Sequence, residues 1–232
     1  MKRKLLLFSV CFIFAANFSI AQNSGSGGGF LSKFDFGVKM GMNSSRLLVE
    51  SDHFTAPKTG FQVGVFAEFR IIDLLSVSFE PMYMLQGAND INPQSFYSES
   101  SPLLIGLKRM DVRLKSISLP LLVNAVIPSE GFQPKFFAGA SFDLYNRAYT
   151  FNKHILSYNS VEKSSVTQDD IKDRVKQYGI SGVVGAGIVK KMDPLVLSVD
   201  LRYMIGIMNI NNVVNYPPLN NSTFALTLGI GF

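Results

Sequence analysis

Alternation between large apolar residues and small or polar ones constrains this chain more than any other feature. The last segment shows it most clearly, with large residues at Phe224, Leu226, Leu228, Ile230 and Phe232 and small or polar ones at Thr223, Ala225, Thr227, Gly229 and Gly231. Successive side chains of a β-strand point to opposite faces, so a period of two residues predicts a strand with one apolar face. We therefore expect an all-β protein.

The same alternation recurs upstream and gives eight predicted strands in total. They lie near residues 34–41, 61–70, 75–83, 116–124, 136–147, 178–189, 195–203 and 223–232. Short connections lie near 71–73, 128–134 and 191–194, and long ones at 43–58, 87–110, 150–176 and 208–222. An even number of strands, with short turns at one end and long loops at the other, is typical of an outer-membrane barrel. The predicted fold is an eight-stranded antiparallel up-and-down transmembrane β-barrel with short periplasmic turns and long extracellular loops.

Three positions depart from this regular pattern. Pro81 and Pro120 lie inside predicted strands, where a residue without an N–H removes a ladder hydrogen bond, so we expect a bulge or kink at each. Thr167 and Asp170 have the spacing of a capping box, and Ile171 and Val175 lie four residues apart. This spacing predicts a short helix over 167–176.

The N-terminus has the pattern of a secretory signal peptide. Three basic residues precede an apolar run over 5–18, and Ser19-Ile20-Ala21 then supplies small residues for cleavage after Ala21. A membrane anchor is the alternative, but this run is short for a bilayer. Residues 22–33 read as a flexible Gly/Ser leader, which leaves 34–232 as the barrel domain.

Removal of residues 1–21 changes what the rest of the chain can do. It removes three bases and no acid, so the formal net charge falls from +5 to 5 − 3 = +2, and no nucleic-acid-binding surface is expected. The only cysteine, Cys11, is removed as well, so no disulfide, cysteine metal site or thiol nucleophile is expected. No later run approaches 18 apolar residues, which argues against a transmembrane helix.

The positions of the charged residues bear on which face of the strands meets lipid. Nine of them lie opposite the apolar face: Asp35, Lys39, Glu68, Arg70, Glu80, Asp143, Arg147, Asp200 and Arg202. A soluble lipocalin-like barrel, the alternative, would point its apolar face inward, whereas a membrane barrel points it toward lipid. Aromatic residues at both ends of the apolar faces favour the membrane barrel, because they suit two membrane interfaces.

An eight-stranded barrel leaves room inside only for side chains, so the nine charged residues are expected to fill the lumen and to leave no pore. Five acids nearly balance four bases. A buried charge without a partner costs several kcal/mol, so we expect a paired network and not an active site.

Several segments resemble the PorT-like outer-membrane β-barrel family. They are Lys58-Thr59-Gly60-Phe61-Gln62-Val63-Gly64, Glu80-Pro81-Met82-Tyr83-Met84-Leu85-Gln86-Gly87-Ala88, Ile117-Ser118-Leu119-Pro120-Leu121-Leu122-Val123, Phe137-Ala138-Gly139-Ala140 and Leu228-Gly229-Ile230-Gly231-Phe232. The resemblance implies an eight-stranded barrel in a family whose members mostly have no known activity. Its founding member is tied to protein secretion and gliding machinery, which implies an alternative role as a subunit or assembly factor of an envelope secretion machine.

The sequence offers little catalytic chemistry. The only histidines, His53 and His154, fall in separate predicted loops, which makes a poor metal site. Ser51-Asp52-His53 contains the residue types of a triad, but adjacent residues do not usually converge as one. We expect no catalytic residue, metal or cofactor. The alternative enzyme class is an outer-leaflet lipid hydrolase or acyltransferase.

The predicted function is that of a non-enzymatic integral outer-membrane barrel, with a structural or interaction role through its surface loops. Expected partners are outer-membrane lipids and lipopolysaccharide, the barrel-assembly machinery during insertion, and an envelope protein. Four basic residues are candidate contacts for lipopolysaccharide phosphates: Lys108, Arg109, Arg113 and Lys115. Arg113 and Lys115 share the phase of Ile117 and should point outward just above the apolar belt. The alternative for all four is a solvated strand end.

Overall fold

The computed structural model describes residues 33–49, 55–91, 107–158, 161–213 and 218–232. The chain divides into two units, residues 1–34 and 35–232, and the sheet belongs to the second. The predicted signal peptide and most of the leader lie outside the described residues, as does Ser51-Asp52-His53. The side chains of Lys108, Arg109 and His154 are not described either.

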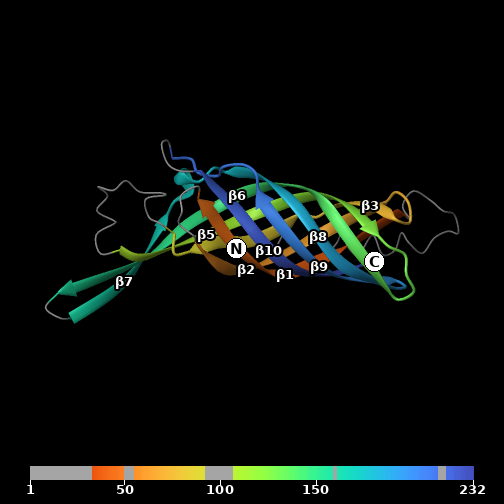
Figure 1. The fold of residues 1–232 in the computed structure, drawn as a ribbon, viewed down its shortest axis with the longest axis horizontal. Coiled ribbons are helices and arrows are strands. Elements are labelled where there is room, and N and C mark those ends of the chain that lie inside the picture. Colours follow the sequence, from red (N-terminus) through yellow and green to blue (C-terminus); the bar gives the residue numbers. More distant parts are fainter. Residues whose placement is uncertain (1–32, 50–54, 92–106, 159–160, 214–217) are drawn as a thin grey trace, which may run out of the picture. The chain divides into compact units, whose positions relative to one another are not determined.

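The second unit is a closed antiparallel barrel (Figure 1). Its elements are β1 (Phe34–Val49), β2 (Ala56–Arg70), β3 (Leu75–Phe79), β4 (Met82–Asn89), β5 (Leu107–Val126), β6 (Phe132–Tyr158), β7 (Val161–Asp170), the 3-10 helix η4 (Lys172–Arg174), β8 (Tyr178–Met192), β9 (Leu195–Gly206) and β10 (Leu219–Gly231). β3 and β4 share one position between β2 and β5, and β10 returns to pair with β1. The ring therefore has eight strand positions, as predicted.

The predicted third strand is interrupted at Pro81. The pairs Phe79↔Leu121 and Met82↔Ser118 place Glu80 opposite Pro120. The Glu80 N–H donates to the Pro120 carbonyl at 3.0 Å, while Pro120 has no N–H to return the bond. Both prolines thus weaken the same stretch of ladder, and the break falls between β3 and β4. Against β6, Pro120 causes no bulge, because β5 runs through that residue in register with β6.

Burial on β1 and β10 shows apolar side chains pointing out of the barrel and small or polar ones pointing in. On β1, Val38, Met40 and Met42 are exposed, while Lys39 and Asn43 are buried. On β10, the even-numbered apolar residues from Phe224 to Ile230 are exposed and the residues between them are buried. A soluble barrel would show the opposite pattern. The apolar belt is the surface that a transmembrane barrel presents to lipid.

Aromatic residues flank this belt on its outward face. Phe224 and Tyr203 form a cross-strand pair toward the long-loop end, and Phe61 and Tyr83 lie on the neighbouring wall. Phe136 lies toward the short-turn end and is 53% exposed. Aromatic rings at both edges of an apolar band are the interface girdles of membrane barrels.

Strands extend much further into the predicted long loops than the alternation indicated. β6 continues to Tyr158 and pairs with β7, and this hairpin projects beyond the barrel wall (Figure 1). The helix predicted over 167–176 is therefore wrong: Thr167 to Asp170 end β7, and only the three-residue η4 follows. Cross-strand pairing with β6 outweighs the weak capping signal.

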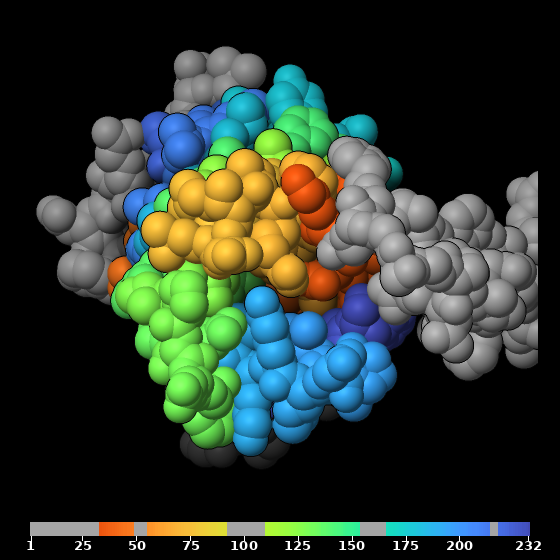
Figure 2. Space-filling model, turned by 90° about the vertical axis from the view of Figure 1, so that its right-hand side faces the viewer, coloured from red at the N-terminus to blue at the C-terminus, as the bar shows by residue number. Residues whose placement is uncertain are grey.

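The short turns gather at the opposite end of the barrel. Figure 2 looks onto this end, where the orange β2–β3 turn, the green β5–β6 turn and the blue β8–β9 turn lie side by side. Such short turns face the periplasm in bacterial outer-membrane barrels. Among the described residues, no helix is both long and apolar enough to cross a bilayer.

Candidate functional site

Four charged side chains meet in the middle of the lumen, and we call them the central quartet: Lys39, Glu80, Asp200 and Arg202. The Lys39 Nζ lies 2.7 Å from Glu80 Oε1 and 2.9 Å from Asp200 Oδ2. The Arg202 Nη2 lies 2.8 Å from Glu80 Oε2 and 3.7 Å from Asp200 Oδ2. All four side chains are only 1% exposed. Two acids and two bases thus neutralise one another inside a low-dielectric core.

The quartet comes from strands on opposite sides of the ring. Lys39 lies on β1, Asp200 and Arg202 lie on β9, and Glu80 lies at the break between β3 and β4. Ser78, two residues before Glu80 and on the same face, donates its hydroxyl to Glu80 Oε1 at 3.1 Å. Aromatic rings lie against the cations: Lys39 Nζ is 5.1 Å from the Phe66 centroid, and the Arg202 guanidinium is 5.5 Å from that of Phe137.

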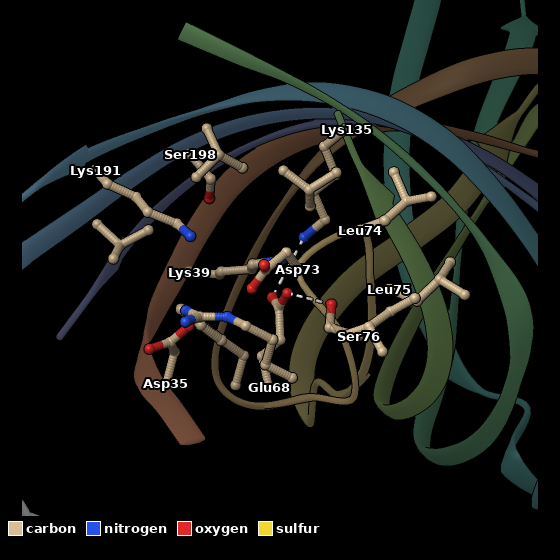
Figure 3. A pocket seen from close by; sticks show the side chains of 16 residues that line it. Asp35, Lys39, Glu68, Asp73, Leu74, Leu75, Ser76, Lys135, Lys191 and Ser198 are labelled. Atoms are coloured by element: carbon tan, nitrogen blue, oxygen red, sulfur yellow. Dashed lines mark hydrogen bonds and ion pairs between the residues drawn. The ribbon is translucent and has the colours of Figure 1, made fainter. Parts of the chain in front are cut away.

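Below the quartet, a charged pocket opens at the short-turn end (Figure 3). Its empty volume is about 570 Å³, including the open space at its mouth. Glu68 lies in its centre, where it accepts a hydrogen bond from Ser76 and lies 3.6 Å from the Lys135 Nζ. Arg70 and Asp35 pair at 2.9 Å and are partly exposed. Arg70 and Asp35 thus pair across the neighbouring strands β1 and β2, whereas Lys135 on β6 reaches Glu68 on β2 across the lumen.

On the long-loop side of the quartet, three serine hydroxyls surround the carboxylate of Asp143. Asp143 accepts hydrogen bonds from Ser118 at 2.6 Å, Ser141 at 2.8 Å and Ser181 at 2.6 Å. All four residues are buried. Three hydroxyl donors can stabilise a buried carboxylate without a basic partner. Among the described residues, Asp143 is held by these hydrogen bonds and forms no ion pair.

Apolar side chains close the lumen in two places. One cluster lies next to the quartet and comprises Met82, Met84, Leu122, Phe137, Val183 and Met204. The other fills the outer end and comprises Leu47, Ala88, Ile91, Met110, Val112, Leu114, Tyr145, Ala148, Ile171, Val175, Ile210 and Leu219. We call the second cluster the outer cap. Backbone hydrogen bonds fix it, including Ile171 N–H to Ala148 O at 3.0 Å and Ile210 N–H to Leu219 O at 2.8 Å.

Eight of the nine predicted lumen residues lie on the inward face or at the mouth, but Arg147 does not. The register of β5 against β6 shifts after Lys115↔Arg147, because Asn146 is an extra residue before Ser116↔Tyr145. A one-residue bulge moves the following side chains to the other face. Arg147 is exposed on the outer wall, where its Nη1 donates to the Tyr149 hydroxyl at 3.4 Å. The prediction that Arg147 belongs to the lumen is wrong.

Lys135 is a basic residue of the lumen that the predicted set of nine does not include. It is buried, its Nζ lies 3.6 Å from Glu68 Oε2, and it lies 5.6 Å from the centroid of Phe137, the ring that also contacts Arg202. The alternation does indicate an inward position for Lys135, since it lies on the same strand face as Phe137 and Ser141. The predicted turn ends at Pro134 and the predicted strand begins at Phe136, so the prediction assigns Lys135 to neither. With Lys135 included, the lumen still has four bases to five acids.

Arg113 and Lys115 point outward, as predicted from their alternation with Ile117. Arg113 is exposed and its guanidinium lies 4.2 Å from the Phe151 centroid, while Lys115 is half-buried. Lys108 and Arg109 open β5, and their side chains lie outside the described part of the chain. Within that part, no group of three or more His, Cys, Asp and Glu side chains could hold a metal ion.

Family comparison identifies the barrel. The model of the outer membrane protein beta-barrel domain matches residues 20–212, which is most of the chain. The chain belongs to this family. The family and the inside-out barrel together place the protein in the outer membrane of a Gram-negative envelope. No curated protein matches the sequence significantly.

The chain is also similar, at low sequence identity, to solved structures of bacterial surface and outer-membrane proteins. Neisserial surface protein A (NspA) is 15% identical, with a TM-score of 0.44, over 86% of this chain and 97% of that one. The attachment invasion locus protein Ail of Yersinia pestis is 12% identical, with a TM-score of 0.41, over 86% and 99%. The outer membrane protease OmpT of Escherichia coli is 10% identical, with a TM-score of 0.42, over 86% and 96%.

Proposed function

We propose that this protein is a non-enzymatic outer-membrane barrel whose lumen serves as a structural core and whose outer end makes its contacts. The central quartet carries this proposal. Its charges are fully buried and mutually paired, which leaves no free acid or base of the quartet for catalysis. The outer cap lies between this network and the long-loop end, so a solute meets packed side chains on both levels.

The β6–β7 hairpin is the part of the outer end best suited to contact another molecule. Its ten cross-strand pairs run from Tyr149↔Asp170 to Tyr158↔Val161, well beyond the belt. Among the described strands, β7 pairs only with β6, so its other edge is open. An open strand edge offers backbone donors and acceptors to a partner.

Shortening this hairpin tests the proposal. Replacement of residues 153–166 by Asn-Gly should give a two-residue turn between the paired Asn152 and Thr167. The variant should fold, because the outer cap residues that flank η4 (Ile171 and Val175) and those on β6 remain, and we expect its unfolding free energy to change by less than about 1 kcal/mol. The shortened variant should fail to complement a deletion strain, whereas Glu130→Gln, in a short turn, should complement it. Full restoration by the shortened variant would contradict a role for the hairpin.

A role within an envelope secretion machine is the alternative that the PorT-like segments support. A specific, stoichiometric complex with secretion components, isolated from crosslinked membranes and lost in the shortened variant, would favour it over a free-standing barrel.

A further inference from the structure

The structure brings three cations together on the lipid-facing wall near the outer end. Lys115 on β5 lies directly opposite Arg147 on β6, and Arg113 is the next outward residue of β5 and faces Tyr149. The sequence alone did not indicate this group, because Arg147 reaches the outer face only through the bulge at Asn146. We call these three residues, Arg113, Lys115 and Arg147, the basic triad.

Folding alone does not explain the pair at the centre of the triad. The Cβ atoms of directly opposed residues on one face of an antiparallel pair lie about 5 Å apart, and like charges in these positions destabilise the sheet. Within the described residues, neither Lys115 nor Arg147 forms an ion pair with a carboxylate. An anion bound from outside would relieve this repulsion.

Aromatic neighbours hold the two arginines against the wall. The Arg113 guanidinium stacks 4.2 Å from the Phe151 centroid, and Arg147 donates to the Tyr149 hydroxyl. Both contacts restrict long side chains, which lowers the entropy cost of binding an anion between them.

The height of the triad on the wall indicates which anion it meets. Lys115 is one outward step above Ile117, which faces the girdle residue Tyr83 across the β4–β5 pair. One outward step is two residues, or about 7 Å along the strand. The triad thus lies just outside the hydrocarbon layer, at the depth of lipid headgroups.

We propose that the basic triad binds the phosphate of a lipid headgroup in the outer leaflet. Arginine and lysine form short, charge-assisted hydrogen bonds to phosphate oxygens, and two or three cations suit the charge of a phosphomonoester. The inference goes beyond the proposed function, because it adds a lipid ligand on the outer wall, and it uses no residue removed by the hairpin deletion. Failure of one test therefore leaves the other intact.

The test compares the full mature chain with Lys115→Gln/Arg147→Gln in maltoside detergent, with bisphosphorylated lipid A as the probe. We expect the double variant to bind lipid A at least about tenfold more weakly, since two charge-assisted contacts are lost. Lys172→Gln/Lys191→Gln is the matched control. Both of its residues are exposed and it removes the same charge, but neither lies in the triad, so binding should change less than about twofold.

Two further measurements separate a phosphate site from other causes. Lipid A should raise the melting temperature of the native protein more than that of the double variant. Without lipid, the double variant should melt at the same or a higher temperature, because the opposed like charges are gone. If the double variant does not fold, Arg147→Gln alone should show the same loss in smaller measure. Equal binding of dephosphorylated lipid A, displacement by equimolar inorganic phosphate, or an equal loss in the control would overturn the proposal.

Discussion

Replacement of Glu80 by alanine should destabilise the barrel by about 3–5 kcal/mol, because removal of one partner from a buried ion network leaves charges uncompensated. Glu80 is the acid that contacts both Lys39 and Arg202 at less than 3 Å. Without it, Asp200 alone faces two cations. Arg202→Ala should cost a comparable amount, since Glu80 and Asp200 would then share only Lys39.

The double variant Glu80→Ala/Arg202→Ala should lose less than the sum of the two single losses. It keeps the Lys39–Asp200 pair at 2.9 Å and removes one acid and one base together. Contacting residues in one network commonly show coupling energies of about 0.5–3 kcal/mol. Urea-dependent unfolding in lipid vesicles measures all three variants, and heat-modifiable mobility reports folding. Glu130→Ala, at an exposed turn residue, is the control and should be near neutral.

Strictly additive losses would show that Glu80 and Arg202 are not coupled. A different result would favour the enzyme alternative: single variants that stay fully stable but lose an activity on envelope lipids would assign the quartet to catalysis and not to structure.

An arginine in the middle of the apolar belt should cost about 2–4 kcal/mol and impair insertion. Val65 on β2 and Val199 on β9 are suitable sites, since both point outward. Val65 lies midway between Phe61 and Phe69, and Val199 lies four residues from Tyr203 toward the short-turn end. Val65→Arg or Val199→Arg places a charge in the hydrocarbon layer, where an apolar valine side chain is stable and a charged one is not. Refolding into vesicles, followed by urea titration, measures the loss.

A residue near the membrane interface provides the control for this prediction. Ile207 is 69% exposed and follows the end of β9, beyond the girdle residue Tyr203. Ile207→Arg should therefore cost only about 0–1 kcal/mol, the range for interfacial positions. Equal effects at Val199 and Ile207, or none at Val65 and Val199, would contradict the lipid-facing assignment.

The local features of the sequence predicted the wall of the barrel well. Alternation fixes which face each residue occupies, so the outward position of Leu226 and the inward position of Asp200 follow from phase alone. The eight positions and the irregularity at Pro81 follow from the same pattern and from proline chemistry.

Features that depend on a neighbouring strand could not be predicted in this way. Arg147 changes face because of a bulge against β5, and no local signal marks Asn146 as the extra residue. The β6–β7 hairpin lies beyond the lipid belt, where nothing requires one apolar face, so its strands lack the alternation that identifies the others. The partners within the quartet come from strands up to 161 residues apart, and their pairing depends on the closed ring.

Conductance in planar lipid bilayers tests the filled lumen most directly. The central quartet, the apolar cluster beside it and the outer cap should leave no continuous water path. Purified, heat-modifiable protein should therefore show no large, stable conductance steps at neutral pH. Reproducible porin-like steps from the folded protein would contradict the account of the lumen as a structural core.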